Sequence, residues 1–219
     1  NILVQNNTNN RHIVFKCNDD GTIKEGLRLD GAVPEVVVNQ GGTDFNNTLV
    51  NFRVESDNNT YMLYVKGAND AVGINNSDPK TDLDVHHNPT TLANDTGGGE
   101  AVKFGTGTTT TGKLYYLHSG SSWEQTDMIN AASGGLGMLG IALGAAPATN
   151  GMLIRGFFDV HTYLSGAFVP GATVYISAPG HITTMRPSGS GEILRVLGNC
   201  TTQANVVYFN PSPDYLIVT

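Results

Sequence analysis

Apolar and polar residues alternate in short runs along the first part of the chain. Residues 50–55 read Val-Asn-Phe-Arg-Val-Glu, a period of two that is typical of a half-buried β-strand. Asp20-Gly21 indicates a turn, and further short strands are predicted over residues 12–15, 36–38, 61–65, 72–74 and 83–85. Such strands are too short and too few to enclose a core, because isolated hairpins are marginal in water. We therefore expect identical chains to cover their apolar face, as in intertwined trimers built from short strands.

The second part of the chain has a similar pattern with longer strands. Nine are predicted, over residues 101–104, 113–118, 136–143, 152–160, 173–177, 181–185, 192–197, 205–210 and 214–218. Turn residues separate them, which favours a β-sandwich or a barrel-like domain. The predicted fold class is therefore all-β, with a segment of short strands followed by this C-terminal domain.

Charge and composition change near residue 97. The chain has 219 residues, of which 12 are basic and 19 are acidic, for a net charge of −7. Residues 1–97 contain 20 of these charged residues and residues 98–219 only 11. The breaker-rich segment 88–99 is expected to be a linker or an irregular connection. We predict two domains, a segment of short strands over 1–97 and a C-terminal β domain over 98–219, whose low-charge surface suits contact with another subunit.

Composition also argues against several function classes. Gly, Asn and Thr form a third of the chain, which disfavours a helical protein. The small number of basic residues disfavours binding to a nucleic-acid backbone. The longest nearly apolar run, 138–148, contains Pro147 and is much shorter than the ~20 residues that span a bilayer. We expect no nucleic-acid partner and no membrane insertion.

Cysteine and histidine positions give little support for a cofactor or metal. Cys17 and Cys200 are far apart in sequence, so they form either a disulfide or two isolated thiols. The only adjacent histidines are His86 and His87, and neighbours on a strand point to opposite faces. We therefore predict no metal site and no cofactor.

Two further patterns are weak candidates for chemistry. Asp78, Asp82 and Asp84 form an acidic cluster, which is either an acid/base pair or, more simply, a solvated strand face. Residues 135–140 match Gly-x-Gly-x-x-Gly, but no strand is expected before them and no helix after them, as a dinucleotide site requires. No catalytic residue is predicted, and the chain is expected not to be an enzyme.

Two aromatic residues are candidates for contact with a receptor. Trp123 follows a Ser-Gly-Ser-Ser stretch that is typical of a loop, and Tyr163 lies in the sequence Val-His-Thr-Tyr-Leu. Loop aromatics stack on sugar rings, but they also cover the cores of β proteins.

Three stretches resemble virion fibre proteins of bacteriophages, particularly marine and cyanobacterial phages. Residues 51–60 read Asn-Phe-Arg-Val-Glu-Ser-Asp-Asn-Asn-Thr and precede Met-Leu-Tyr-Val at 62–65. Residues 71–79 read Ala-Val-Gly-Ile-Asn-Asn-Ser-Asp-Pro and precede Leu-Asp-Val at 83–85, where such fibres often have Val-Gly-Ile-Gly-Thr-x-x-Pro and Leu-Asp-Val. Asn75 and Asn76 stand where Gly-Thr is usual. The third stretch, 191–198 followed by 207–211, is similar to the C-terminal domain of such proteins.

The resemblance implies an elongated, homotrimeric, β-rich appendage on the virion. Its distal domain would meet a host-surface glycan without turnover, and other tail or capsid proteins would be its partners. A capsid decoration or head fibre is the nearest alternative. A polysaccharide-degrading tailspike is disfavoured by the six acidic residues of 98–219, and a non-viral carbohydrate-binding or adhesin module is the remaining alternative.

Overall fold

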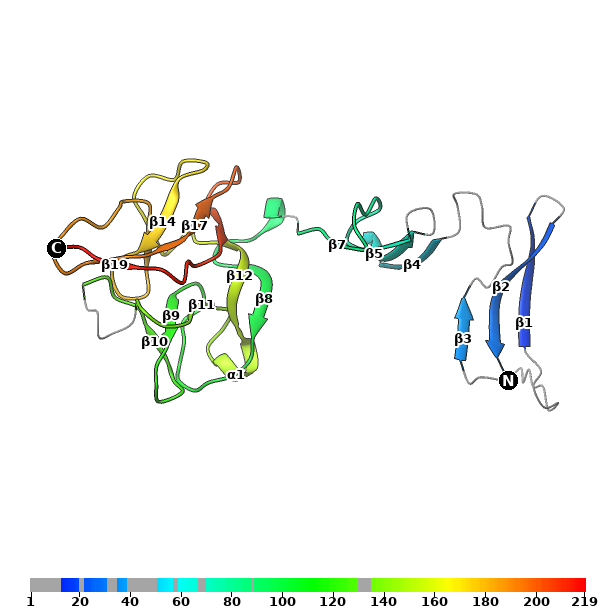
Figure 1. The fold of residues 1–219 in the computed structure, drawn as a ribbon, viewed down its shortest axis with the longest axis horizontal. Helices are drawn as coiled ribbons and strands as arrows, with labels where there is room; N and C mark the ends of the chain where they lie inside the picture. Colours follow the sequence, from blue (N-terminus) through cyan, green and yellow to red (C-terminus); the bar gives the residue numbers. More distant parts are fainter. Residues whose placement is uncertain are drawn as a thin grey trace. The chain divides into compact units, whose positions relative to one another are not determined.

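The chain folds into two compact units, residues 1–86 and residues 87–219, which are coloured blue to green and green to red in Figure 1. The structure, a computed structural model, describes residues 13–19, 22–30, 35–38, 51–56, 59–66, 70–87, 89–129 and 135–219. Nearly all of its regular structure is β-strand, so the predicted all-β class is confirmed.

The units divide eleven residues before the domain boundary expected from composition. Residues of the expected linker fold with the second unit: a 3-10 turn covers Pro89–Thr91, and β8 begins at Gly97. The backbone N–H of Asp159 donates to the carbonyl of Thr96 at 2.8 Å. This segment is therefore anchored by backbone pairing, despite its breaker-rich composition.

The first unit contains two small sheets. Three antiparallel strands form one of them: β1 (Ile13–Asp19), β2 (Thr22–Asp30) and β3 (Glu35–Val38). The expected strand over 36–38 lies within β3. The Asp20-Gly21 turn lies outside the described residues.

The second sheet of this unit has four strands in sequence order, namely β4 (Asn51–Ser56), β5 (Asn59–Lys66), β6 (Ala71–Ile74) and β7 (Leu83–Val85). Adjacent strands are antiparallel except for the parallel pair β6–β7. Among the side chains that the structure describes in the first unit, the buried apolar ones are Tyr64, Ala71 and Pro79. A sheet with so little interior cannot bury its own apolar surface.

The second unit is built on one large sheet with the strand order β10-β9-β11-β12-β18-β17-β14-β15-β13, and β8 also pairs with β12. This sheet curls into a half-barrel. Its strands are β8 (Gly97–Val102), β9 (Leu114–Leu117), β10 (Trp123–Gln125), β11 (Leu139–Ala142), β12 (Met152–Asp159), β13 (Leu164–Ser165), β14 (Thr173–Ile176), β15 (Ile182–Thr183), β17 (Val196–Cys200) and β18 (Val206–Phe209). A separate pair joins β16 (Ile193–Leu194) to β19 (Leu216–Ile217), and the short helix α1 covers Pro147–Asn150.

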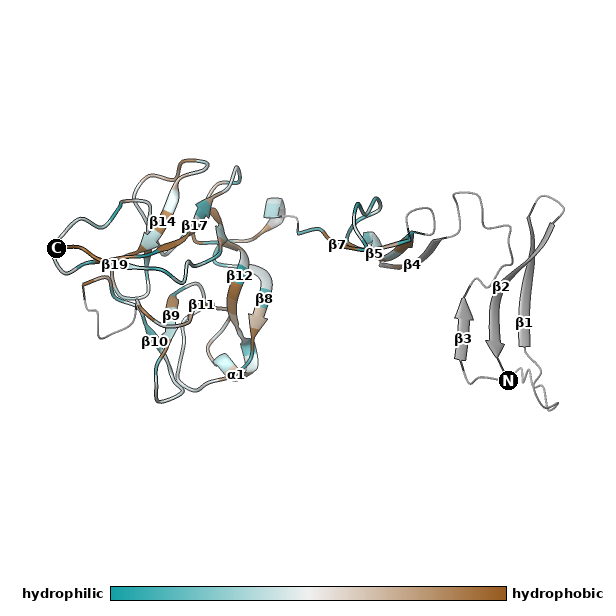
Figure 2. Cartoon of the chain, in the orientation of Figure 1, coloured by the Kyte–Doolittle hydropathy of each residue, from teal (hydrophilic) through white to brown (hydrophobic). Residues whose placement is uncertain are grey.

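The core of the second unit lies inside this curled sheet. Alternate residues of the strands point inward, and the apolar character of β12 appears as brown in Figure 2. Phe158, Val207 and Phe209 are fully buried (0% exposed) at the centre of a cluster to which most strands contribute. Burying such side chains stabilises the fold by roughly 1.5–3 kcal/mol each.

Trp123 and the strand expected over 192–197 are two places in the second unit where the structure differs from the sequence prediction. Trp123 begins β10 and does not lie in a loop, because residues 123–125 pair with 115–117 of β9. The single strand expected over 192–197 is divided into β16 and β17. The residue between them, Arg195, turns inward and donates hydrogen bonds to the carbonyls of Gly135 and Gly137 at 2.6 and 2.7 Å.

Gly198 gives a direct test of the pairing between β17 and β18. It has φ +140°, and a Cβ atom there would clash with the carbonyl oxygen of Tyr208. We expect Gly198→Ala to lower the free energy of unfolding by at least about 2 kcal/mol, because backbone strain and a steric clash add. Gly98→Ala is the matched control, since a Cβ there meets nothing within 4 Å. Denaturant unfolding that affects both variants equally would contradict this expectation.

Candidate functional site

One face of the sheet β4–β7 consists of apolar side chains. The register places Val54, Leu63, Ile74 and Val85 in one row across the four strands. A second row runs through Val65, Val72 and Leu83. Residues two apart on a strand share a face, so the two rows lie side by side. We call these seven residues the apolar face.

The apolar face is open in the single chain. Val54, Val65, Leu83 and Val85 are 43%, 37%, 62% and 47% exposed, and the other three residues of the face are half-buried. None of the seven carries a charge. Exposed apolar surface of this continuity marks a contact with another surface.

The opposite face of the same sheet is covered by the segment between β6 and β7. Asn76 of this segment is only 5% exposed, and its carbonyl oxygen occupies the space that a Cβ of Gly73 would need. Gly73 is therefore required for this close approach. The covered side includes the buried side chains of Tyr64 and Ala71 and is packed within the chain, while the apolar face on the other side remains open.

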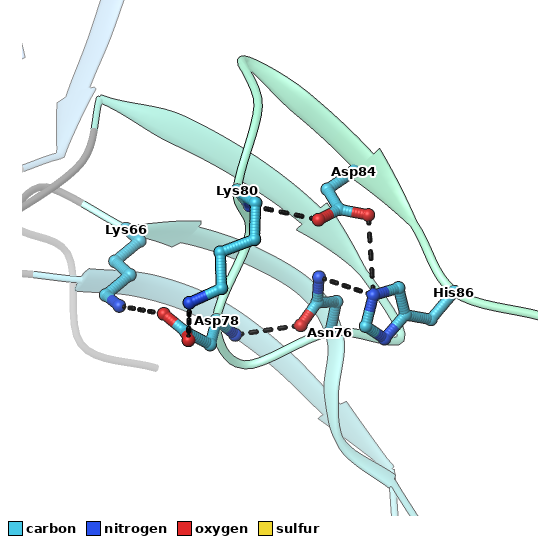
Figure 3. A network of polar contacts seen from close by, with 6 residues as sticks. All are labelled: Lys66, Asn76, Asp78, Lys80, Asp84 and His86. Carbon is cyan, nitrogen blue, oxygen red and sulfur yellow. Dashed lines mark hydrogen bonds and ion pairs between the residues drawn. The ribbon is translucent and has the colours of Figure 1, made fainter.

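A polar network holds the covering segment in place (Figure 3). Asp78 forms ion pairs with Lys66 (2.6 Å) and with Lys80. The Asn76 side-chain oxygen accepts a hydrogen bond from the backbone N–H of Asp78 at 2.8 Å. The other end of the network joins Asn76 to His86, with 3.0 Å between Nδ2 and Nε2.

This network accounts for two members of the acidic cluster seen in the sequence. Asp78 is paired with two lysines, and Asp84 accepts a hydrogen bond from the backbone N–H of Lys80 at 3.0 Å. His86 Nε2 lies 3.4 Å from the other carboxylate oxygen of Asp84. Asp78 and Asp84 hold the segment between β6 and β7 in place, which favours a structural role for these two carboxylates over an acid/base pair.

The network gives the first unit a measurable dependence on pH. Hydrogen bonds from Lys66 and then Lys80 lower the pKa of Asp78 from 3.8 to about 2. Its stabilising contribution is therefore present above pH 3.8 and is lost as pH falls toward about 2. We expect Asp78→Asn to weaken the acid dependence of unfolding in that range, with exposed Asp70→Asn as the control. Urea unfolding followed by the amide NMR signal of Gly73 at several pH values checks this, and identical acid dependence in both variants would count against it.

Trp123 is placed in the interior of the second unit. It is 2% exposed, and its indole Nε1–H donates to the carbonyl of Phe104 at 2.9 Å. It packs in a cluster with Tyr115, Ala142 and Met152. The chain itself covers the indole ring, which gives Trp123 a packing role in this structure.

Tyr163, the other aromatic candidate, is half-buried just before β13. Its ring meets that of His181 edge-on, with 5.3 Å between centroids, and the Lys113 ammonium lies 5.8 Å from the ring centroid. Lys113 also donates to the side-chain oxygen of Gln125 at 3.3 Å. Burial, and then the nearby Lys113 charge, lowers the pKa of His181. Tyr163 stays a candidate contact residue at the surface, whereas Trp123 lies in the interior.

The structure also assembles an aromatic surface that no local sequence pattern indicated. Phe157 of β12 pairs with Tyr208 of β18, and their ring centroids are 5.2 Å apart. Arg155 donates from Nε to the Tyr208 hydroxyl at 2.9 Å, and this contact raises the pKa of Arg155. Strand β8 also pairs with β12, so that Gly98 lies opposite Phe157 and Glu100 lies opposite Arg155. We call these five residues the aromatic platform.

A small hollow adjoins the aromatic platform. It has a volume of about 180 Å³ and is lined by His87, Pro89, Leu92, Gly97, Gly98 and Phe157. The sequence contains a signal for part of this surface, because Arg155 and Phe157 are two residues apart on a predicted strand. It contains no local signal for the pairing with β8 and β18, since these strands are more than 45 residues away on either side.

Comparison with known proteins leaves the resemblance to phage fibres as an expectation from the sequence. No protein-family model matches the chain, and no curated protein and no solved structure matches it either.

Other candidate chemistry is limited in the parts of the chain that the structure describes. These residues contain no group of three or more His, Cys, Asp or Glu side chains placed to hold a metal ion. Cys200 is a free, buried thiol whose pKa is raised by burial, while the Cys17 side chain lies outside the described part. No helix among the described residues is long and apolar enough to cross a membrane.

Proposed function

We propose that this protein is a non-catalytic structural fibre of a virion that assembles from three identical chains and attaches to the host cell surface. The observation that supports it best is the apolar face of the sheet β4–β7, which is open although few of the side chains described in this unit are buried. Such a unit needs a cover that is present whenever it folds. Further copies of the same chain are always present in equal amount, and their apolar faces can cover one another.

Charge supports identical copies as the occupants of the apolar face. The chain carries a net charge of −7, and like charges brought together at an interface are costly. The apolar face has no charged residue, while Lys66, Asp78, Lys80 and Asp84 belong to the opposite side. Copies that meet through this face keep their like charges apart.

The second unit suits a distal role in such a fibre. It has an apolar core of its own, to which most of its strands contribute. Its half-barrel carries the aromatic side chains of Tyr163, Phe157 and Tyr208 at its surface. These are suitable for contact with a host-surface glycan.

The test has two readouts, on the full chain and on purified particles. Light scattering is expected to give a molar mass near three times 23.2 kDa, and labelled antibodies against the protein are expected to mark the tail of the particle. A stable monomer would overturn the trimer. Antibody label on the capsid shell would favour the alternative of a head fibre or capsid decoration, and release of oligosaccharide from host polysaccharide would favour a tailspike enzyme.

A further inference from the structure

The aromatic platform combines the groups that recognise sugars. We propose that it binds a neutral saccharide, whose rings stack on Phe157 and Tyr208. This inference deepens the proposed function, on which it rests, by naming the site and the class of ligand on the second unit. Neither residue was a candidate from sequence.

The two rings point away from the core. Their neighbours along the strands, Phe158, Val207 and Phe209, are fully buried, so alternation puts Phe157 and Tyr208 on the outer side of the sheet. Both are half-buried, and Arg155 on the same side is exposed. Tandem aromatic rings on a rigid sheet provide stacking surface at little cost in conformational entropy.

Gly98 leaves room for a ligand next to Phe157. It is the β8 residue opposite Phe157, and a Cβ added to it would meet no heavy atom within 4 Å. The hollow of about 180 Å³ opens at this position, with Leu92 and Pro89 in its lining. An apolar hollow beside a ring suits the apolar face of a sugar ring.

Polar groups around the rings suit sugar hydroxyls. Arg155 uses Nε for the Tyr208 hydroxyl, which leaves the terminal nitrogens of this exposed side chain to face solvent. Glu100 is the opposite residue on β8, and Asn199 is opposite Tyr208 on β17. Hydrogen-bond donors and acceptors for sugar hydroxyls are therefore both present beside the two rings. The positive charge of Arg155 and the negative charge of Glu100 offset each other, which favours a neutral saccharide over an acidic one.

The experiment measures affinity for defined oligosaccharides with the full chain. The probes are oligomers of glucose, galactose, mannose and N-acetylglucosamine, with oligomers of galacturonic acid for comparison. We expect binding to at least one neutral probe, and weakening by at least about tenfold in Tyr208→Ala and in Gly98→Val. Gly98→Val fills the hollow from a position where a Cβ has open space, so its effect does not depend on unfolding.

Matched variants show whether a loss of affinity arises at the platform itself. Tyr215→Ala and Met185→Ala remove apolar side chains elsewhere on the unit, which are 41% and 62% exposed, and both are expected to keep the affinity within about twofold. Tyr163→Ala tests the other aromatic candidate for glycan contact. Fluorescence of Trp123, the single tryptophan, reports whether each variant is folded.

Three outcomes would overturn the inference. They are binding to no neutral probe, stronger binding to the galacturonic acid oligomers than to every neutral probe, and neutral-sugar binding that is lost in Tyr163→Ala but kept in Gly98→Val. The molar mass and the location on the particle are measured separately. A trimer on the tail without sugar binding would thus remove the saccharide site and leave the proposed function standing.

Discussion

Leu83→Asp is expected to convert the proposed trimer into single chains. Leu83 is the most exposed residue of the apolar face, at 62%, so an aspartate there costs the isolated chain little. At an interface between copies the same carboxylate is buried without a partner, which costs several kcal/mol for each ion. In a symmetric assembly each copy carries the substitution at the same contact, so each copy adds the same cost. Light scattering should show the molar mass falling to that of one chain.

Met62→Asp is the matched control for this change. Met62 is 45% exposed and lies on β5 beside Leu63, so it points to the side opposite the apolar face. The same charge is therefore added to the same sheet, and we expect the molar mass to stay unchanged. If Met62→Asp separated the copies while Leu83→Asp did not, the interface would lie on the other side of the sheet.

Arg195→Ala is expected to destabilise the second unit by about 3 kcal/mol. Arg195 is 5% exposed, and its guanidinium donates to three carbonyls, those of Ser212 (2.7 Å), Gly135 (2.6 Å) and Gly137 (2.7 Å). Desolvation by burial lowers its pKa, so the site holds a charge at a cost that these hydrogen bonds offset. Removing the donor leaves buried carbonyls unsatisfied, which costs more than the net value of the bonds.

Denaturant unfolding followed by Trp123 fluorescence measures this effect in the second unit, where the single tryptophan is buried. Arg186→Ala is the control, because Arg186 is an exposed arginine of the same unit. We expect Arg186→Ala to change the free energy of unfolding by no more than about 0.5 kcal/mol. Equal losses in the two variants would mean that the buried hydrogen bonds of Arg195 contribute nothing.

The Gly-x-Gly-x-x-Gly pattern of residues 135–140 illustrates how far a local motif can be interpreted. Its flanking residues argue against a dinucleotide site, because they predict neither the strand nor the helix that such a site needs. In the structure the first two glycines supply carbonyls to Arg195, and β11 begins at Leu139. The partner lies about sixty residues away in the chain, so no inspection of the motif could have identified it.

Trp123 shows the same limit for burial. A Ser-Gly-Ser-Ser stretch before an aromatic residue is typical of a loop, and the three-residue strand β10 is too short to produce a clear period of two. Pairing with β9 and the hydrogen bond to Phe104 place the indole inside. Tertiary contacts thus decided the role of a residue whose local sequence pointed elsewhere.

The sequence by itself determined the all-β class and the positions of many strands, including β6 and β7 almost residue for residue. It also predicted that the short strands of the first part are too few to enclose a core. These properties follow from the period of two, which depends only on neighbouring residues. Only the tertiary structure decided which strands pair and in which register. The apolar face is formed by four strands in register, and the aromatic platform joins residues 98, 157 and 208. Pairing between distant strands depends on the packing of the whole sheet, and no local pattern encodes it.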